Sequence, residues 1–338
     1  MLKPYEASSK MWASRVNRMG TTGSWPFAAV RCGRFEPGEF CKEPCVLRRS
    51  LLICLLAACL FGFSGHSLAG TITHYTFDSD VLGREYSYNV YLPDGYNTGD
   101  LAYPVLYLLH GSGGNENDWP VYGKVQSTVD YLIEEGAIPP TIIVMPGSKS
   151  WWVDGYNEDA ETAFFSDLVP HIETTFSTIS DRSGRLVAGL SAGGYGTINF
   201  VLEYPDMFAA GAALSPASYV PYPPTMSSAN RHPAFQDTDG KFDKELWRRL
   251  NYTQHIDSYK AQDLVVPLYI NSGDHDSLDI AFHAAVLFQS LREHQPDLVE
   301  FRVVDGGHDW EVWSKTLSEA LAYIFRFSSR PEGKSQTD

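Results

Sequence analysis

Most of this chain lacks cysteine. All five cysteines lie before residue 70, at Cys32, Cys41, Cys45, Cys54 and Cys59. Residues 70–338 can therefore form no disulfide, offer no thiol nucleophile and build no cysteine-ligated metal site. Exported bacterial enzymes commonly have this composition, so the absence of cysteine is compatible with a location outside the cytosol.

Basic side chains are also scarce. Lys and Arg number 26 against 41 Asp and Glu, which gives a net charge of −15 at pH 7. A general nucleic-acid-binding protein needs a basic face, so the charge balance excludes that class and we expect no nucleic-acid partner. Apolar residues make up 43% of the chain and charged residues 20%, which is enough to bury a core and excludes wholesale disorder.

No hydrophobic run reaches the length of a comfortable membrane span. The longest, LLICLLAACLFGF at residues 51–63, is well short of the roughly 20 residues that a transmembrane helix needs. Arg48 and Arg49 precede it and Ser67-Leu68-Ala69 follows it, which is the order of parts in a secretory signal peptide. We therefore expect a signal peptide at residues 48–69, a periplasmic or secreted protein, and no stable membrane span in the mature chain.

The N-terminal region leaves alternatives open. The sequence Leu-Ala-Ala-Cys ending at Cys59 resembles a lipobox, so a lipid anchor at Cys59 is the alternative to cleavage before Gly70. Residues 1–47 precede the basic start of the signal. We expect them to be a doubtful N-terminal extension, either an over-extended gene start with initiation near residue 46 or a cytosolic segment.

Downstream of residue 70, apolar runs typical of buried strands alternate with helical spacing of apolar residues. This alternation predicts the α/β class, with a mostly parallel central sheet and helices on both faces. The first two strands alternate in polarity and are expected to form an antiparallel pair. The expected strands are residues 71–77, 84–92, 104–109, 141–145, 185–190, 209–214, 264–270 and 299–304, and the expected helices are 118–135, 161–176, 192–204, 278–293 and 310–327.

One segment departs from this alternation. Residues 216–260 are rich in Pro, Ser, Tyr and Asn, and we interpret them as a loop-rich insertion with a short helix near residues 243–250. Long irregular insertions often serve as lids or binding loops.

In the expected helix 118–135, Val121 is predicted to share the buried side with Val125. A single folded domain is expected to span residues 70–328, with 329–338 as a flexible tail.

The first chemical motif is Gly189-Leu190-Ser191-Ala192-Gly193, between a predicted strand and a predicted helix. In a G-x-S-x-G turn the chain reverses so tightly that side chains at the glycine positions would clash, and the serine hydroxyl becomes exposed. Ser191 is therefore the candidate nucleophile, and the N–H of Ala192 is a candidate oxyanion donor.

The second motif, His110-Gly111-Ser112-Gly113-Gly114, directly follows the expected strand 104–109. Acyl transfer places negative charge on a carbonyl oxygen, and two backbone N–H groups must point at it. Ser112 is the candidate for the second donor. His110 could act as a base, but we favour a structural role in which it braces the loop.

Two later loops supply the remaining candidates. His308 follows the last strand and is the candidate general base for Ser191, because that role requires a titratable imidazole. A carboxylate must orient the imidazole, and Asp276 is favoured over Asp274, which leaves the turn at Gly273 too early. The neighbouring side chains of Asp274, His275 and Asp276 point in different directions, so we expect no metal and no cofactor.

The order Ser191, Asp276, His308 along the chain is typical of α/β-hydrolases. The segments HGSGGNENDW, GLSAGGYG, SWWVDG…ET and GGHDWEVW, spread over about residues 72–328, resemble the putative esterase family. This family includes esterase D, S-formylglutathione hydrolases, feruloyl esterases, enterochelin esterases and mycolyltransferases. The resemblance implies an α/β-hydrolase fold and a serine esterase with Ser191 as nucleophile, His308 as base, Asp276 as acid, and oxyanion donors at Ser112 and Ala192. Ala192 replaces the methionine usual in the family, which keeps the backbone donor.

The residues leave the substrate open. Trp151, Trp152 and Asp154 follow a strand end, where α/β sheets bind ligands, and with Trp119 and Trp310 they could form an aromatic wall against an aromatic acyl group or a sugar. Packing is the alternative for each tryptophan. We expect a small-molecule or carbohydrate-linked ester as substrate, such as a feruloyl or acetyl ester of a sugar. An acyltransferase of the mycolyltransferase type and a non-catalytic binding protein are the alternative functions.

Overall fold

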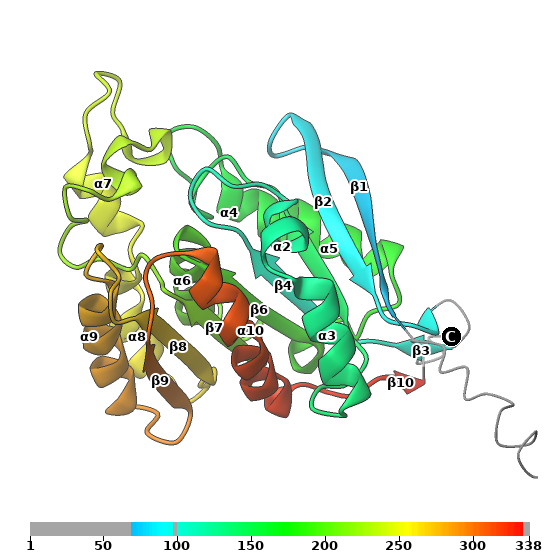
Figure 1. The fold of residues 1–338 in the computed structure, drawn as a ribbon. Helices are drawn as coiled ribbons and strands as arrows, with labels where there is room; N and C mark the ends of the chain where they lie inside the picture. The colour runs from blue at the N-terminus through cyan, green and yellow to red at the C-terminus, as the bar shows by residue number, and fades with distance from the viewer. Residues whose placement is uncertain (1–68, 97–99, 334–338) are drawn as a thin grey trace, which may run out of the picture. The chain divides into compact units, whose positions relative to one another are not determined.

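An eight-stranded sheet forms the centre of the fold (Figure 1). The structure is a computed structural model that describes residues 69–96 and 100–333. The expected N-terminal extension, the apolar run of the signal peptide and Cys59 lie outside the described residues. In spatial order the strands are β1 (Thr71–Ser79), β2 (Arg84–Leu92), β5 (Ile142–Pro146), β4 (Val105–Leu109), β6 (Arg185–Leu190), β7 (Ala210–Leu214), β8 (Leu268–Gly273) and β9 (Val299–Val304).

The direction of the strands matches the prediction. β1 and β2 pair antiparallel along their whole length, and β2 pairs antiparallel with β5. From β5 to β9 all neighbours are parallel. The inner strands β4, β5, β6 and β7 are almost completely buried, which explains their continuous apolar sequences. Parallel strands place all their carboxyl ends at one edge of the sheet, where α/β proteins bind ligands.

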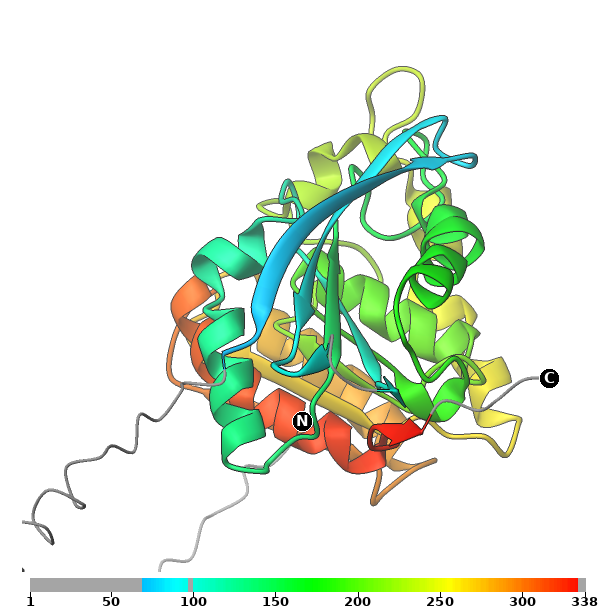
Figure 2. The same cartoon turned by 90° about the vertical axis from the view of Figure 1, so that its right-hand side faces the viewer.

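Helices cover both faces of the sheet, as Figure 2 shows. One face packs against α2 (Asp118–Tyr122), α3 (Val125–Glu134) and α10 (Trp310–Ile324). The other face packs against α4 (Ala160–Ala163), η2 (Phe164–Leu168), α5 (Val169–Thr175), α6 (Ala192–Glu203), α8 (Ile256–Lys260) and α9 (Ile280–Arg292). Short 3-10 turns η3 (Arg182–Gly184) and η7 (Phe325–Phe327) complete this part. Among the described residues, no helix is both long and apolar enough to cross a membrane.

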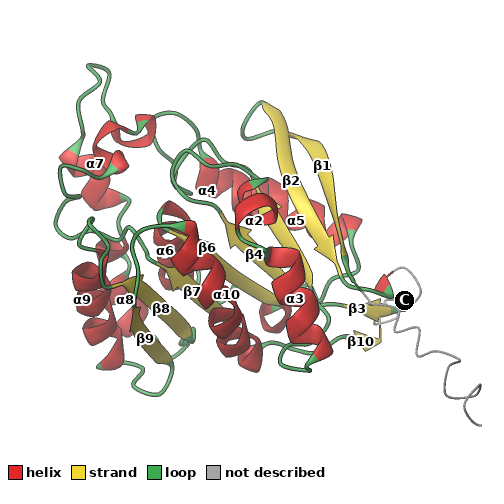
Figure 3. Cartoon of the chain, in the orientation of Figure 1, coloured by secondary structure: helices red, strands yellow, loops and turns green. Residues whose placement is uncertain are grey.

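The loop-rich insertion contains only short helices joined by loops (Figure 3). They are η4 (Ser228–Arg231), η5 (Pro233–Phe235), α7 (Lys244–Arg249) and η6 (Tyr252–Gln254), followed by α8. The predicted short helix is confirmed as α7, whose first turn is capped by the side chain of Asp243. A separate aromatic cluster that includes Phe235 and Trp247 holds the insertion against Tyr195 of α6.

The predicted helix 118–135 is divided into two. Lys124 adopts a left-handed conformation with φ +52° between α2 and α3, which ends one helix and starts another. The break changes the phase of the helix, so that α2 buries Trp119 and leaves Val121 65% exposed. The prediction that Val121 lies on the buried side was therefore wrong. The predicted helix 161–176 also differs, because a π-helical segment, η2, separates α4 from α5.

The expected flexible tail is partly tied down. Ser329 donates its N–H to the carbonyl oxygen of Ser183 at 2.8 Å, and the two hydroxyls are 2.7 Å apart. β10 (Glu332–Gly333) then pairs antiparallel with β3 (Leu101–Ala102). The expectation of a tail without structure is therefore corrected for residues 329–333, because backbone and side-chain groups find partners there; residues 334–338 are outside the described part.

Candidate active site

Ser191 lies on a sharp turn between β6 and α6. Its backbone has φ +52° and ψ −112°, a region that a residue with a side chain adopts only under strain. A Cβ on Gly189 would lie 2.5 Å from the carbonyl group of Gly193, and a Cβ on Gly193 would lie 2.5 Å from the carbonyl oxygen of Leu109. Both glycines are therefore required for this close approach, as the motif predicted.

A continuous chain of hydrogen bonds joins Ser191, His308 and Asp276. Nδ1 of His308 is 2.7 Å from Oδ2 of Asp276, and Nε2 of His308 is 2.9 Å from Oγ of Ser191. A carboxylate can only accept, so Nδ1–H donates to Asp276, and Nε2 is left to accept the Ser191 hydroxyl proton. The three residues come from the loops after β8 and β9 and from the turn after β6, all at the carboxyl edge of the sheet.

The two candidate carboxylates have different surroundings. The side chain of Asp276 is fully buried, and its second oxygen accepts the N–H of Leu278 at 3.0 Å. Asp274 is exposed and turns away, accepting the N–H of Gly306 and the ring N–H of His275. The hydrogen bond from Gly306 lowers the pKa of Asp274. The structure therefore brings Asp276, and not Asp274, to His308.

His110 braces the loop that follows β4. Its Nε2 accepts the N–H of Ser148 at 2.9 Å, so the proton of the neutral ring is on Nδ1, which donates to the Gly111 carbonyl at 2.8 Å. Burial lowers the pKa of His110, which keeps the ring neutral. Both nitrogens are occupied by backbone groups, so His110 has the structural role that we favoured.

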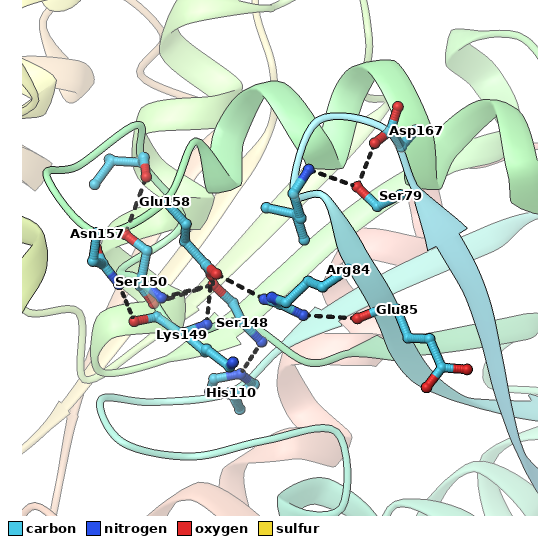
Figure 4. Close-up of polar contacts among 12 residues, drawn as sticks. Ser79, Arg84, Glu85, His110, Ser148, Lys149, Ser150, Asn157, Glu158 and Asp167 are labelled. Atoms are coloured by element: carbon cyan, nitrogen blue, oxygen red, sulfur yellow. Dashed lines mark hydrogen bonds and ion pairs between the residues drawn. The ribbon is translucent and has the colours of Figure 1, made fainter.

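The Ser148 loop is itself held from the other side. Figure 4 shows Glu158 between this loop and Arg84 at the start of β2. One oxygen of Glu158 accepts the N–H of Lys149 at 2.7 Å, and the other pairs with Arg84 at 2.7 Å. The ion pair, the Ser148 loop and His110 thus connect the antiparallel edge of the sheet to the His110-Gly111-Ser112 segment.

The backbone N–H groups of Ser112 and Ala192 have no hydrogen-bond partner within the part of the chain that the structure describes. Ala192 is the first residue of α6, where helix geometry leaves N–H groups free. The hydroxyl of Ser112 accepts two hydrogen bonds, from the indole N–H of Trp151 at 3.1 Å and from Ser228 at 3.0 Å. These contacts fix the loop that carries the Ser112 N–H.

A pocket of about 400 Å³ opens over Ser191. Trp151 and Trp310, both predicted from the sequence, contribute to its wall. Ser112, His308 and Ser191 also line it, together with residues that sequence reasoning did not connect with the site. These additional lining residues include Tyr219, Met226, Ser228, Arg231, Leu278 and Trp313. Most come from the insertion, where no sequence motif marks them. Trp313 lies on α10, where its side chain is largely buried.

The other predicted substrate residues do not line this pocket. Trp119 is buried and donates its indole N–H to the Leu109 carbonyl, and Trp152 is buried and donates to the His110 carbonyl. Both rings therefore pack inside the protein, at the start of the loop that follows β4. Asp154 accepts the N–H and hydroxyl of Thr162 at the start of α4. The expected aromatic wall is corrected accordingly: it contains Trp151 and Trp310, with Trp119 behind Trp310 at 5.3 Å between ring centroids.

One group of side chains has the composition of a metal site. Ligand atoms of Asp274, His275 and Asp305 lie within 4.8 Å of one another, and all three side chains are exposed. The 2.7 Å hydrogen bond between His275 and Asp274 accounts for their closeness. The candidate residues around Ser191 supply a hydroxyl, an imidazole and backbone N–H groups, which are the groups used in metal-free acyl transfer.

A mostly parallel sheet with the serine on a tight strand-to-helix turn, followed by the carboxylate and the histidine, defines the α/β-hydrolase fold. The model of the family described as "Putative esterase" matches residues 79–324. The chain therefore belongs to this esterase family. The resemblance noted in the sequence is thereby confirmed.

Individual relatives support the same assignment. An endo-1,4-beta-xylanase/feruloyl esterase of Xylanibacter ruminicola is 39% identical over 45% of this chain and 22% of its own length. An esterase of Mycobacterium tuberculosis is 34% identical over 55% of this chain and 43% of its own. The chain thus spans less than half the length of these curated relatives. A solved ferulic acid esterase is 28% identical, with a TM-score of 0.67 over 77% of this chain and 98% of that one.

Proposed function

We propose that the protein is an exported serine esterase that cleaves carboxylic esters through an acyl-enzyme intermediate. The observation that carries the proposal is the hydrogen-bonded chain Ser191–His308–Asp276 at the wall of an open pocket. Each member has a role that its geometry suits. Ser191 is the nucleophile, His308 the general base and Asp276 the residue that orients the imidazole.

In the acylation step the Ser191 hydroxyl attacks the ester carbonyl carbon while Nε2 of His308 takes its proton. Asp276 stabilises the imidazolium that forms and stays ionised itself. The carbonyl oxygen becomes an oxyanion, which the N–H groups of Ser112 and Ala192 stabilise. The tetrahedral intermediate collapses, His308 gives its proton to the leaving alcohol, and the acyl group remains on Ser191.

In the second step a water molecule replaces the alcohol. His308 takes a proton from the water, the resulting hydroxide attacks the acyl-enzyme, and the carboxylic acid leaves as the proton returns to Ser191. An acceptor alcohol could take the place of water, which would make the protein an acyltransferase. The esterase names of the relatives favour hydrolysis, and product analysis with and without an acceptor alcohol distinguishes the two.

The proposed substrates are feruloyl, acetyl or other acyl esters of sugars. Trp310 gives the pocket aromatic surface for a phenolic acyl group or a sugar ring, and the buried Trp151 lies within the wall. The named activity of the xylanase/feruloyl esterase relative and of the ferulic acid esterase structure supports the same substrate class. Export is proposed from the signal-peptide pattern at residues 48–69 and the absence of cysteine after residue 69.

The test uses purified protein with 4-nitrophenyl esters of increasing acyl length and with methyl ferulate. We expect a burst of 4-nitrophenol equal to the enzyme concentration when deacylation is slow, followed by steady hydrolysis. Ser191→Ala is the matched control and should show neither phase. A folded wild-type protein that hydrolyses none of these esters would refute the proposed function.

A further inference from the structure

Arg231 stands at the wall of the pocket that contains Ser191. It is the last residue of η4 and its side chain is exposed. Within residues 69–96 and 100–333, the Arg231 guanidinium has no carboxylate at ion-pair distance. It also donates no hydrogen bond to any of these residues. Apart from His308, it is the only basic side chain among the described lining residues.

Most other arginines of the described chain have partners. Ion pairs with glutamate involve Arg84, Arg185, Arg248, Arg302 and Arg326. Arg182 donates to two backbone carbonyl groups. Within the described residues Arg249, Arg292 and Arg330 also lack such a partner, but of all these arginines only Arg231 lines the pocket. Its planar set of donors matches the two oxygens of a carboxylate.

The backbone that carries Arg231 is held firmly. The Ser227 hydroxyl accepts the N–H of Ala229 at the start of η4, and Ala229 is fully buried. The Asn230 amide donates to the Pro224 carbonyl at 2.7 Å. Ser228 donates to Ser112 at 3.0 Å, which ties η4 to the oxyanion loop. Little ordering of this backbone is therefore needed when a ligand binds.

The pocket also contains one carboxylate, Asp118 of α2. A Cβ on Gly114 would lie 2.2 Å from Oδ2 of Asp118, which places this carboxylate against the His110–Gly114 loop. Arg231, by contrast, comes from the insertion. The two charges form no ion pair with each other, so the positive charge of Arg231 is not neutralised from within the pocket.

We propose that Arg231 is a specificity-determining residue that binds a carboxylate of the substrate. The preferred substrate is then an ester that carries a second, anionic group. This carboxylate could lie on the acyl part, as in a dicarboxylic acid monoester, or on the alcohol part, as in a uronic acid that is acylated on a hydroxyl group. This inference rests on the proposed function, because the same pocket and Ser191 carry out the cleavage.

The experiment compares anionic and neutral esters of similar shape. For the acyl side we would use mono-4-nitrophenyl adipate against 4-nitrophenyl hexanoate, and for the alcohol side 4-acetoxybenzoate against 4-acetoxybenzamide. Arg231→Gln should lower kcat/KM for the anionic ester of one pair about tenfold, mainly through KM, as expected for a charge-assisted hydrogen bond at a partly solvated site. The neutral esters should change less than about threefold. The pair that responds identifies the side that bears the carboxylate.

Two further variants make the result decisive. Arg231→Lys keeps the charge and should recover part of the discrimination, while Arg292→Gln removes an exposed charge on α9 outside the pocket and should leave both pairs unchanged. Equal effects of Arg231→Gln on anionic and neutral esters, or no effect on either pair, would overturn the assignment of Arg231. Failure of the proposed function looks different, because the wild-type protein would then cleave no neutral ester at all.

Discussion

Gly273 and Gly306 are in backbone contact. A Cβ on Gly273 would lie 2.2 Å from the carbonyl oxygen of Gly306, and that oxygen also accepts the N–H of His275 at 2.9 Å. The two glycines begin the loops that carry Asp276 and His308. Their contact therefore fixes the spacing between the carboxylate and the imidazole, and a side chain at Gly273 would push the two loops apart.

Replacement of the nucleophile gives the first prediction. Ser191→Ala should lower kcat for ester hydrolysis by roughly 10⁴-fold or more, because among the described residues Ser191 alone has a hydroxyl that is hydrogen-bonded to His308. Steady-state kinetics measure the loss, and thermal unfolding checks that the variant is folded. The serine mechanism fails if the pure, folded variant turns over at a near-normal rate.

The two carboxylates near His308 give the second prediction. Asp276→Asn should lower kcat by roughly 10²- to 10⁴-fold with little change in binding, because an amide no longer stabilises the imidazolium. Asp274→Asn is the matched control and should lower kcat about tenfold at most, since the exposed Asp274 side chain is hydrogen-bonded to Gly306 and His275 and not to His308. Parallel kinetics on both variants decide the matter, and the reverse ranking would assign the acid to Asp274.

The third prediction concerns the Ser112 hydroxyl. Ser112→Ala keeps the backbone N–H but removes the acceptor shared by Trp151 and Ser228. The loop loses its anchor, so kcat should fall about tenfold with KM nearly unchanged. Ser228→Ala removes one of the two contacts and should have a smaller effect. Unaltered kcat in a folded Ser112→Ala protein would show that these contacts do not position the oxyanion donor.

A buried carboxyl group outside the site gives a prediction on pH and stability. Burial, together with the neighbouring Glu203, raises the pKa of Glu161 to about 8, although the Tyr204 hydroxyl donates to it. The folded chain thus holds a proton that the unfolded chain loses above about pH 4.5. The protonated Glu161 therefore stabilises the folded state fully at acid pH, and this contribution to the free energy of unfolding is lost as the pH rises through 8.

Glu161→Gln should remove this dependence. The variant should gain roughly 1 to 3 kcal/mol of unfolding free energy relative to the wild type between pH 5 and pH 8.5. Urea unfolding at several pH values measures the difference. Glu245→Gln, on the exposed face of α7, is the control, and its unfolding free energy should change with pH as that of the wild type does. If the unfolding free energy of Glu161→Gln also follows the wild-type pH dependence, Glu161 is ionised in the folded protein at neutral pH.

The fifth prediction concerns the N-terminus that export would leave. N-terminal sequencing of protein recovered from the periplasm or medium should give Gly70 as the first residue, because small residues end the signal pattern at Ala69. Mass spectrometry of the same material detects the alternative, a lipid on Cys59. Protein that retains Met1 and stays in the cytosol would refute export.

The sequence predicted those parts of the molecule that depend on local geometry. Apolar runs predicted the inner strands, and the glycines around Ser191 predicted the tight turn, because only glycine fits at those backbone contacts. The order of Ser191, Asp276 and His308 along the chain also predicted their meeting, since loops after parallel strands share one edge of the sheet.

Other features depend on contacts between distant segments and carry no local signal. The left-handed conformation of Lys124 divides a helix whose apolar spacing continues across the break. Trp119 and Trp152 look like ligand-binding tryptophans in the sequence, but their indole N–H groups donate to carbonyl oxygens at the carboxyl end of β4 and in the residue that follows it. Arg231 and Ser228 reach the pocket only because the insertion folds back over it.

The aromatic cluster beneath the insertion has a consequence for protein engineering. Tyr195 and Asn199 of α6 both donate to the Leu250 carbonyl, and Trp151 packs edge-on against Tyr195 and Phe235. Helix α6, which follows Ser191, therefore supports the loops of the insertion that line the pocket. Transplanting residues 216–260 into a related enzyme would transfer substrate selectivity only if the recipient helix had the same tyrosine and asparagine. Without these two hydrogen-bond donors, the transplanted segment would not be held in its position over the pocket.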